Sequence, residues 1–304
     1  MLTANSSIEN RTWEWHGLPI HYQQAGTAGP ALLLIHGFGA SCDHWRKNLP
    51  PLAQDHRVFA LDLLGFGKSA KPAPGEPLPY NFETWGQQVA AFVQAVVKEP
   101  VFLVGNSIGG VVALQAATLA PDQSRGVILL DCALRQIHDR KLDQQPLLRR
   151  LGRPLLKKAL QNRWLVHWLF NQIAKPRIVR SALKQAYGNG DAVTDELVDL
   201  LLAPARELGA ADVFWAFISN FTGPLPEDLL PHLTCPVLIL WGTADPWEPI
   251  ELGRKLADFP AVENFIPLEG VGHCPQDEVP DVVNPHIQNW VAHHAANLPA
   301  VSSL

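Results

Sequence analysis

The sequence predicts an α/β fold with a mainly parallel central sheet, helices on both faces and one helical insertion. Short apolar runs, typical of strands covered on both faces, alternate with helical patterns up to residue 133 and again after residue 229. A glycine-flanked serine, Ser107, stands between one such run and an alanine-rich helical pattern. Between residues 134 and 228 no comparable β run occurs. Strands that alternate with helices at this spacing favour βαβ units and a parallel sheet.

In the first part of the chain, a β-hairpin is predicted over residues 11–26, at the edge of the sheet, with its turn at residues 16–19. Asn81 is the predicted N-cap of a helix at 82–97. The other elements expected here are strands at 30–35, 58–62 and 127–131, a strand after Pro100 that delivers Ser107, and a helix near 43–52.

After residue 133 the helical patterns are broken by prolines and glycines, and the alternation resumes near residue 236. Strands are expected at 236–241 and 263–267, and helices at 250–259 and 279–295. We therefore expect a core made of residues 1–133 and 229–304, with a helical lid at 134–228.

Composition and charge limit the classes of function. The 304 residues can bury a sizeable core, and 47% hydrophobic with 17% charged residues is ordinary for a soluble globular protein. A formal net charge of -5 argues against a general nucleic-acid partner.

The four cysteines are widely scattered and form no CxxC pair, which indicates free thiols in a reducing compartment. The N-terminus lacks a secretory pattern, and no run approaches the roughly 18 apolar residues of a membrane span. We expect a cytoplasmic protein, or one peripheral on a membrane, with no metal and no organic cofactor.

A serine hydroxyl is a weak nucleophile unless a positioned base removes its proton and a third group orients that base. Ser107 lies at the tip of the predicted strand-turn-helix, with Gly105 and Gly109 allowing the close approach that such a strained turn requires. His273 follows the last predicted strand and is the expected base. Asp245 follows the strand before it and is the expected orienting acid. The chain order Ser, Asp, His is the one expected for a triad on this type of sheet.

Asp131 is an alternative acid because it too stands directly after a predicted strand. Asp245 is favoured since it lies in the more glycine-rich turn and nearer to His273 in sequence. The sequence alone keeps both open.

An acyl-transfer enzyme must also stabilise the oxyanion of its tetrahedral intermediate. We expect the backbone N–H groups of Ile108 and Phe38 to supply the two donors. His36, two residues before Phe38, is expected to brace this loop rather than to transfer protons.

The segments HGFGAS, DLLGFGKS, GNSIGG, WGTADPWEP and GVGHCPQDE together resemble the α/β-hydrolase superfamily over nearly the whole chain outside the insertion. This resemblance implies an α/β-hydrolase fold and a serine hydrolase. Ser107 in the elbow argues against the related dehalogenases and epoxide hydrolases, which attack through a carboxylate.

Within the superfamily, GNS, DPW and GHCPQDEVP look like the chloroplast and cyanobacterial group that contains pheophytinase and chlorophyll dephytylase. That likeness implies a large apolar ester as substrate, such as a phytyl ester of a chlorophyll derivative. Asn106 also occurs in carbon-carbon bond hydrolases of ring-cleavage products, so that activity is an alternative. A ligand receptor with the hydrolase fold and little turnover is a third.

The insertion is strongly basic. Thirteen lysines and arginines lie between residues 134 and 187, opposed only by Asp139 and Asp143, and leucines and aromatic residues are interleaved with them. One interpretation is an amphipathic lid that roofs the pocket with its charges solvated. The other is a basic face that rests on an anionic membrane while aromatic residues, among them Phe170, admit a lipid-like substrate. We expect substrate contacts from Trp164, Trp168 and Trp247.

Overall fold

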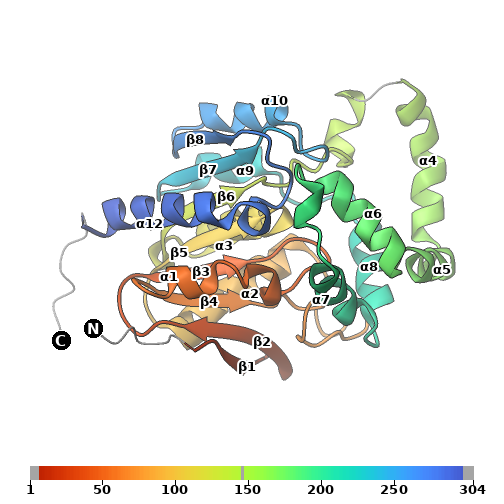
Figure 1. Cartoon of the computed structure of the whole chain (residues 1–304). Coiled ribbons are helices and arrows are strands. Elements are labelled where there is room, and N and C mark those ends of the chain that lie inside the picture. The colour runs from red at the N-terminus through yellow and green to blue at the C-terminus, as the bar shows by residue number, and fades with distance from the viewer. Residues whose placement is uncertain (1–6, 145–146, 297–304) are drawn as a thin grey trace.

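The central sheet of the computed structural model, which describes residues 7–144 and 147–296, has eight strands in the order β1-β2-β4-β3-β5-β6-β7-β8 (Figure 1). Strand β2 pairs antiparallel with β1 and with β4, and all other neighbouring strands pair in parallel. The strands are β1 (Glu9–Trp15), β2 (Leu18–Ala25), β3 (Ala31–Ile35), β4 (Arg57–Leu61), β5 (Val101–Asn106), β6 (Ser124–Leu130), β7 (Val237–Gly242) and β8 (Val262–Leu268). The predicted mainly parallel sheet is confirmed.

The predicted edge hairpin is present, with a shorter turn than expected. His16 and Gly17 form a two-residue connection with φ of 51° and 72°. Positive φ at both central residues is the geometry that suits the right-handed twist of the flanking strands. Leu18 and Pro19, expected in the turn, are the first residues of β2, where Pro19 lies opposite Glu14 of β1.

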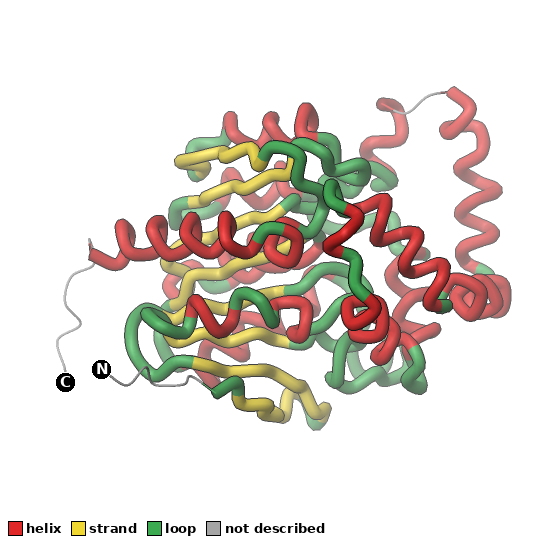
Figure 2. The backbone as a smooth tube through the Cα atoms, viewed as in Figure 1, coloured by secondary structure: helices red, strands yellow, loops and turns green. Residues whose placement is uncertain are grey.

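Helices cover both faces of the sheet, as Figure 2 shows. Alternate side chains of β3 explain why: Leu33 and Ile35 pack into one buried cluster with α2 (Phe82–Phe92) and α3 (Ile108–Leu119). Leu32 and Leu34 point the other way and pack with Trp45, α1 (Leu49–Leu52) and α12 (Pro280–Ala296). A strand covered on both faces therefore has the continuous apolar run seen in the sequence.

Three predicted helices are shorter or less regular than expected. The helix expected near 43–52 is a 3-10 turn at Cys42–Trp45 followed by α1, where two consecutive prolines without N–H groups prevent a continuous ladder. The segment 250–259 is α10 (Ile250–Gly253) followed by a 3-10 turn. Asn81 does cap α2, accepting from the Thr84 amide at 2.8 Å, but α2 passes into a π turn at Val93–Val97.

Between β6 and β7 the described residues form helices and no strand, as the sequence predicts. Helices α4, α5 and α6 stand beyond the carboxyl ends of the parallel strands, with α4 outermost, on the right of Figure 1. The helices of this segment are α4 (Leu147–Gln161), α5 (Arg163–Ile173), α6 (Pro176–Ala186), α7 (Asp195–Ala205), α8 (Ala210–Ile218) and α9 (Pro226–Leu229), and α11 (Pro275–Glu278) follows later, after β8. The boundaries of a separate lid remain a prediction.

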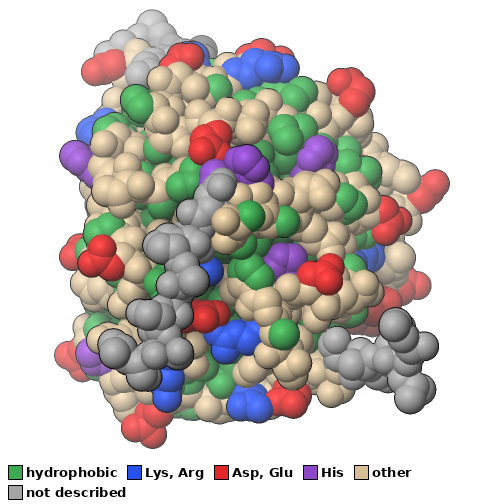
Figure 3. Space-filling view, turned by 90° about the vertical axis from the view of Figure 1, so that its left-hand side faces the viewer, with side chains coloured by type: hydrophobic (Ala, Val, Ile, Leu, Met, Phe, Trp, Pro, Cys, Tyr) green, Lys and Arg blue, Asp and Glu red, His purple; other side chains and the backbone are tan. Residues whose placement is uncertain are grey.

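The opposite side of the molecule carries charges of both signs, interspersed with histidine and hydrophobic side chains (Figure 3). In the part of the chain that the structure describes, no helix combines the length and the apolar character needed to cross a bilayer.

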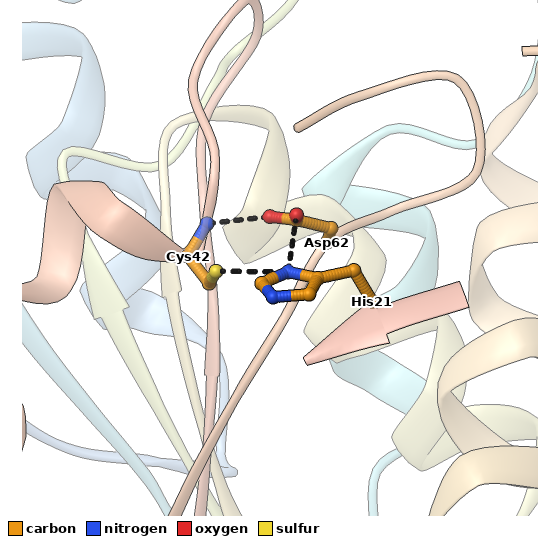
Figure 4. A group of neighbouring side chains, drawn as sticks. All are labelled: His21, Cys42 and Asp62. Carbon is orange, nitrogen blue, oxygen red and sulfur yellow. Dashed lines mark hydrogen bonds and ion pairs between the residues drawn. The ribbon is translucent and has the colours of Figure 1, made fainter. Parts of the chain in front are cut away.

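A buried polar junction formed by His21 of β2, Cys42 of the 3-10 turn and Asp62, which follows β4, ties three segments together (Figure 4). The Asp62 carboxylate accepts from the Cys42 amide at 2.6 Å, from His21 Nδ1 at 2.8 Å and from the Lys68 amide at 2.8 Å. Burial raises the pKa of Asp62, but the hydrogen bonds that its carboxylate accepts outweigh this effect and hold that pKa below its ordinary value. Asp62 is therefore ionised and serves as a shared acceptor for three segments.

These three side chains have metal-ligand chemistry and lie close enough to share an ion. Each is already engaged, because His21 bonds Asp62 through Nδ1 and Asn10 through Nε2, at 3.1 Å. Burial and the neighbouring carboxylates raise the pKa of the Cys42 thiol well above its usual range, which keeps it protonated and a poor ligand. The donor set fits a hydrogen-bonded junction better than a metal site.

We expect Asp62→Ala to lower the free energy of unfolding by about 3–5 kcal/mol, because it leaves buried donors without their charged acceptor. Urea denaturation measures this loss. The control is Asp122→Ala, which removes an exposed carboxylate and is expected to change stability by less than about 0.5 kcal/mol. Equal effects of the two substitutions would contradict the junction's structural role.

Candidate active site

Ser107 lies in the sharp turn between β5 and α3 and adopts φ 55° and ψ -122°, a conformation that residues with a side chain rarely occupy. The flanking glycines make this turn feasible. A Cβ on Gly105 would lie 2.2 Å from the carbonyl oxygen of Gly109, and one on Gly109 would lie 2.3 Å from that of Ile35. The observed geometry is that of a nucleophile elbow.

Asp245 and His273 are joined by a hydrogen bond of 2.7 Å between Oδ2 and Nδ1, and both side chains are buried. The other carboxylate oxygen of Asp245 accepts from the amides of Trp247, at 2.8 Å, and Glu248, at 3.1 Å. Because the carboxylate is an acceptor, the proton of the imidazole lies on Nδ1. Nε2 is thereby left as the nitrogen that can accept a proton.

Asn106 connects the elbow to the loop of His273. Its Nδ2 donates to the carbonyl oxygens of Leu130, at 3.1 Å, and of His273, at 3.0 Å. The Ser107 amide donates to Leu130 as well, at 3.0 Å. The sequence drew attention to Asn106 only through family likeness, whereas the structure gives it a positioning contact on the base loop.

Asp131 neighbours Asp245, and no hydrogen bond joins it to His273 in the part of the chain that the structure describes. Its side chain is fully buried, and Oδ1 accepts from the Gly242 amide at 2.9 Å. Burial, together with the negative charge of Asp245, raises the pKa of Asp131 well above its ordinary value. Because the hydrogen bond of His273 Nδ1 goes to Asp245, the geometry favours Asp245 as the acid that orients the base.

The loop after β3 brings Phe38 next to the elbow. A Cβ on Gly37 would lie 3.3 Å from the Cβ of Ser107, so the two loops are in close contact. Ile108 is the first residue of α3, where backbone N–H groups have no partner within the helix. The two amides expected to form the oxyanion hole thus flank the serine.

His36 braces this loop, as expected. Its Nδ1 donates to the carbonyl oxygen of Gly37 at 2.7 Å, and its Nε2 accepts from the Leu63 amide at 3.1 Å. Burial lowers the pKa of His36, which favours the neutral ring that these two opposite roles require.

A cavity of about 320 Å³ opens in front of Ser107 and His273, a size within the range of ligand sites. The segment 134–228 supplies part of its wall, including Arg135 and several aromatic and aliphatic side chains. The remaining lining residues include Phe82, Trp247 and Glu248.

The three tryptophans expected to contact substrate lie in different surroundings. Trp247 lines the cavity, with its ring centroid 4.9 Å from that of His273. Trp164 and Trp168 are 76% and 53% exposed on α5 and do not belong to the lining of this cavity. Their contact with a substrate stays a prediction.

Glu248 is an ionisable cavity residue that the sequence analysis missed, although it follows Asp245 by only three positions. Burial is the main reason that the pKa of Glu248 is raised from 4.5 to about 8, and the negative charge of Asp245 adds to it. Its Oε2 is buried without a hydrogen-bond partner among the described residues. Two carboxyl groups with raised pKa values, Asp131 and Glu248, therefore stand near Asp245.

The loop of His273 is also held by the end of α6 and the residues that follow it. The His273 amide donates to the carbonyl oxygen of Ala186 at 2.7 Å. The Glu278 carboxylate accepts from the amides of Gly272, at 2.9 Å, Gly188, at 3.1 Å, and Asn189, at 2.7 Å. The position of the base therefore depends on the segment 134–228 as well as on the sheet.

Known proteins resemble this chain, some over most of its length and others over a part of it. A model described as the alpha/beta hydrolase family matches residues 32–286. Chloroplastic pheophytinase of Arabidopsis thaliana is 29% identical over 94% of this chain and 67% of that protein. The 2-hydroxymuconate semialdehyde hydrolase of Pseudomonas sp. (strain CF600) is 38% identical over 35% of this chain and 38% of that protein. Among solved structures, a serine hydrolase involved in carbazole degradation superposes with a TM-score of 0.74 at 21% identity, covering 94% of this chain and 100% of the other, which shows the same fold.

The raised pKa of Glu248 predicts a pH-dependent effect of Glu248→Gln on stability. The pKa of Glu248 is higher in the folded state than in the unfolded chain, so folding takes up a proton. The stabilising contribution of the protonated Glu248 is therefore lost as pH rises toward about 8. We expect the melting temperatures of the variant and the parent to agree near pH 4. The variant should be increasingly more stable than the parent between about pH 5 and 8.

Differential scanning calorimetry across this pH range measures the difference. Glu251→Gln, at an exposed position in α10, is the matched control and is expected to follow the parent at every pH. A melting difference for Glu248→Gln that does not change with pH would contradict the raised pKa.

Proposed function

This chain belongs to the alpha/beta hydrolase family, and we propose that it is a serine hydrolase that cleaves a carboxylic ester of a large apolar substrate through an acyl-enzyme. One observation carries the proposal. Ser107, in a strained elbow, faces the same cavity as His273, whose Nδ1 is held by Asp245.

In the proposed reaction, His273 Nε2 takes the hydroxyl proton of Ser107 while Oγ attacks the ester carbonyl carbon. The amides of Phe38 and Ile108 receive the negative charge that develops on the carbonyl oxygen. The C–O bond of the ester then breaks, and the alcohol leaves with the proton from His273. Water, deprotonated by the same imidazole, attacks the acyl-enzyme and releases the acid and the serine.

A phytyl ester is the substrate that the motifs imply, and the cavity is consistent with it. Phe82, Ile137, Phe217 and Phe221 contribute apolar side chains around the serine. The likeness to chloroplastic pheophytinase, over nearly the whole chain, supports the same choice.

A carbon-carbon bond hydrolase is the second candidate, and Arg135 is the observation that favours it. The Arg135 guanidinium lies over the Phe82 ring at 4.5 Å and lines the cavity, where it offers a positive charge to an anionic substrate such as a dienoate. The local likeness to 2-hydroxymuconate semialdehyde hydrolase points the same way. A ligand receptor with little turnover is the third candidate, and it makes no use of the paired His273 and Asp245.

Ser107→Ala is expected to abolish both ester turnover and labelling by a fluorophosphonate probe, because the attacking oxygen is gone. Turnover of a phytyl ester, a short chromogenic ester and a dienoate ring-cleavage product is compared for the parent, and the labelled residue is identified by mass spectrometry. Ser181→Ala, at an exposed position, is the control and should behave as the parent.

Each alternative has a distinct outcome. Preference for the dienoate over both esters would transfer the assignment to carbon-carbon hydrolysis. An unlabelled parent protein would favour the receptor, and full esterase activity of Ser107→Ala would overturn the mechanism.

Asp245→Asn is expected to lower kcat by roughly 10⁴-fold, because it loses the acceptor that fixes the tautomer of His273. Asp131→Asn keeps a donor toward Asp245 and an acceptor for the Gly242 amide, so we expect less than about a tenfold loss. Steady-state kinetics on a chromogenic ester compares the two. A larger loss for Asp131→Asn would identify Asp131 as the triad acid.

A further inference from the structure

The three helices α4, α5 and α6 concentrate positive charge. Between Leu147 and Ala186 the sequence has ten lysines and arginines and no aspartate or glutamate. The rest of the chain has fourteen basic residues against 29 acidic ones. The molecule therefore combines a net negative charge with one strongly basic region, located at its outer end in Figure 1.

The same helices expose large hydrophobic side chains. Eleven such residues are exposed in the described part of the chain, and six belong to α4–α6: Leu155, Leu156, Trp164, Trp168, Leu169 and Ile178. Clustering of this kind is typical of interaction sites, whereas scattered single residues need no explanation.

Helix α5 has two distinct faces. Val166 is buried, Phe170 packs against Phe214 with ring centroids 5.1 Å apart, and His167 bonds Asp212 at 2.8 Å. Trp164 and Trp168 are four residues apart, share one side of the helix and remain exposed. Their exposure therefore follows from the packing of the opposite face.

Basic side chains accompany the exposed tryptophans. Lys158, Arg177 and Lys184 are exposed, and among the described residues no acidic side chain pairs with them. Arg163 and Arg180 pair with Asp212 and Asp195, so part of the charge is neutralised within the protein. The unpaired cations are available to an external anion.

We propose that the outer surface of α4–α6, here called the basic apolar surface, docks peripherally on an anionic lipid bilayer. Tryptophan side chains favour the bilayer interface, and lysine and arginine are attracted to anionic headgroups. A second copy of this chain would oppose one basic surface with another. A nucleic acid would leave Leu155 and Ile178 in water, whereas a bilayer accommodates both the charges and the apolar side chains.

This surface lies one helix away from the active site. Phe170 and Phe214 line a small apolar cavity of about 60 Å³ together with Phe38, whose amide is assigned to the oxyanion hole. An apolar ester leaving the bilayer at α5 would therefore reach the serine by a short path. This route rests on the proposed function, whereas lipid binding does not.

Vesicle co-sedimentation tests the docking, with phosphatidylcholine vesicles and with vesicles containing 30% phosphatidylglycerol. We expect binding to the anionic vesicles only, weakening as salt rises above about 0.1 M because surface charges are then screened. Two variants should each lower the partition coefficient by about tenfold or more: Trp164→Ala/Trp168→Ala, and Lys158→Gln/Arg177→Gln/Lys184→Gln.

The matched control, Arg11→Gln/Lys98→Gln/Lys255→Gln, removes the same number of exposed charges outside α4–α6 and should bind as the parent does. The charge variant of the surface should keep its activity on a soluble chromogenic ester, which separates loss of docking from loss of folding. If the parent lacks esterase activity but still binds anionic vesicles, the proposed function fails and the docking stands.

Three results would overturn the docking: no sedimentation with either vesicle, equal sedimentation with both, or equal losses in the control and surface charge variants. Self-association in size-exclusion chromatography, dispersed by Trp164→Ala/Trp168→Ala in the absence of lipid, would instead assign the surface to a second copy of the chain.

Discussion

The close approach of β5 and α3 at Ser107 determines where the other parts of the site can stand. No Cβ fits at Gly105 or Gly109, so strand and helix meet at a distance that forces Ser107 into a positive φ. Such strain persists only where the surroundings hold it, and here Asn106 and the Ser107 amide are hydrogen-bonded to neighbouring segments. The base loop and the loop of Phe38 are in turn positioned against this turn.

Electrostatics around the base depend on three carboxyl groups at the ends of β6 and β7. Asp131 and Glu248 have raised pKa values because they are buried near Asp245, which is itself surrounded by donors. Buried carboxyl groups near one another cannot all ionise at low cost, and the raised pKa values of Asp131 and Glu248 favour the negative charge on the group that bonds His273. This distribution suits a base that must carry a transient positive charge.

The segment 134–228 contributes to the site in two ways. Its inner residues line the cavity, and the end of α6 with the residues after it holds the His273 loop through Ala186, Gly188 and Asn189. Its outer surface is basic and apolar, and faces away from the sheet. One segment thus links the base to the surface that we propose for lipid binding.

The sequence by itself determined the succession of strands and helices along the chain, the mainly parallel sheet and the positions of Ser107, Asp245 and His273 after strands. These features follow from local patterns: apolar runs for buried strands, and glycines where the backbone turns sharply. Helix continuity was predicted less well, because Pro50 and Pro51 interrupt the helix expected at 43–52 and α2 passes into a π turn at its end.

Only the tertiary structure decided which side chains meet across the sheet. It paired His273 with Asp245 rather than Asp131, placed Glu248 in the cavity, assembled the Asp62 junction and turned Trp164 and Trp168 outward. The sequence favoured Asp245 but left Asp131 open, and the other features have no local signal. Each depends on residues far apart in sequence, on the burial that shifts a pKa, or on the face of a helix that packing has already occupied.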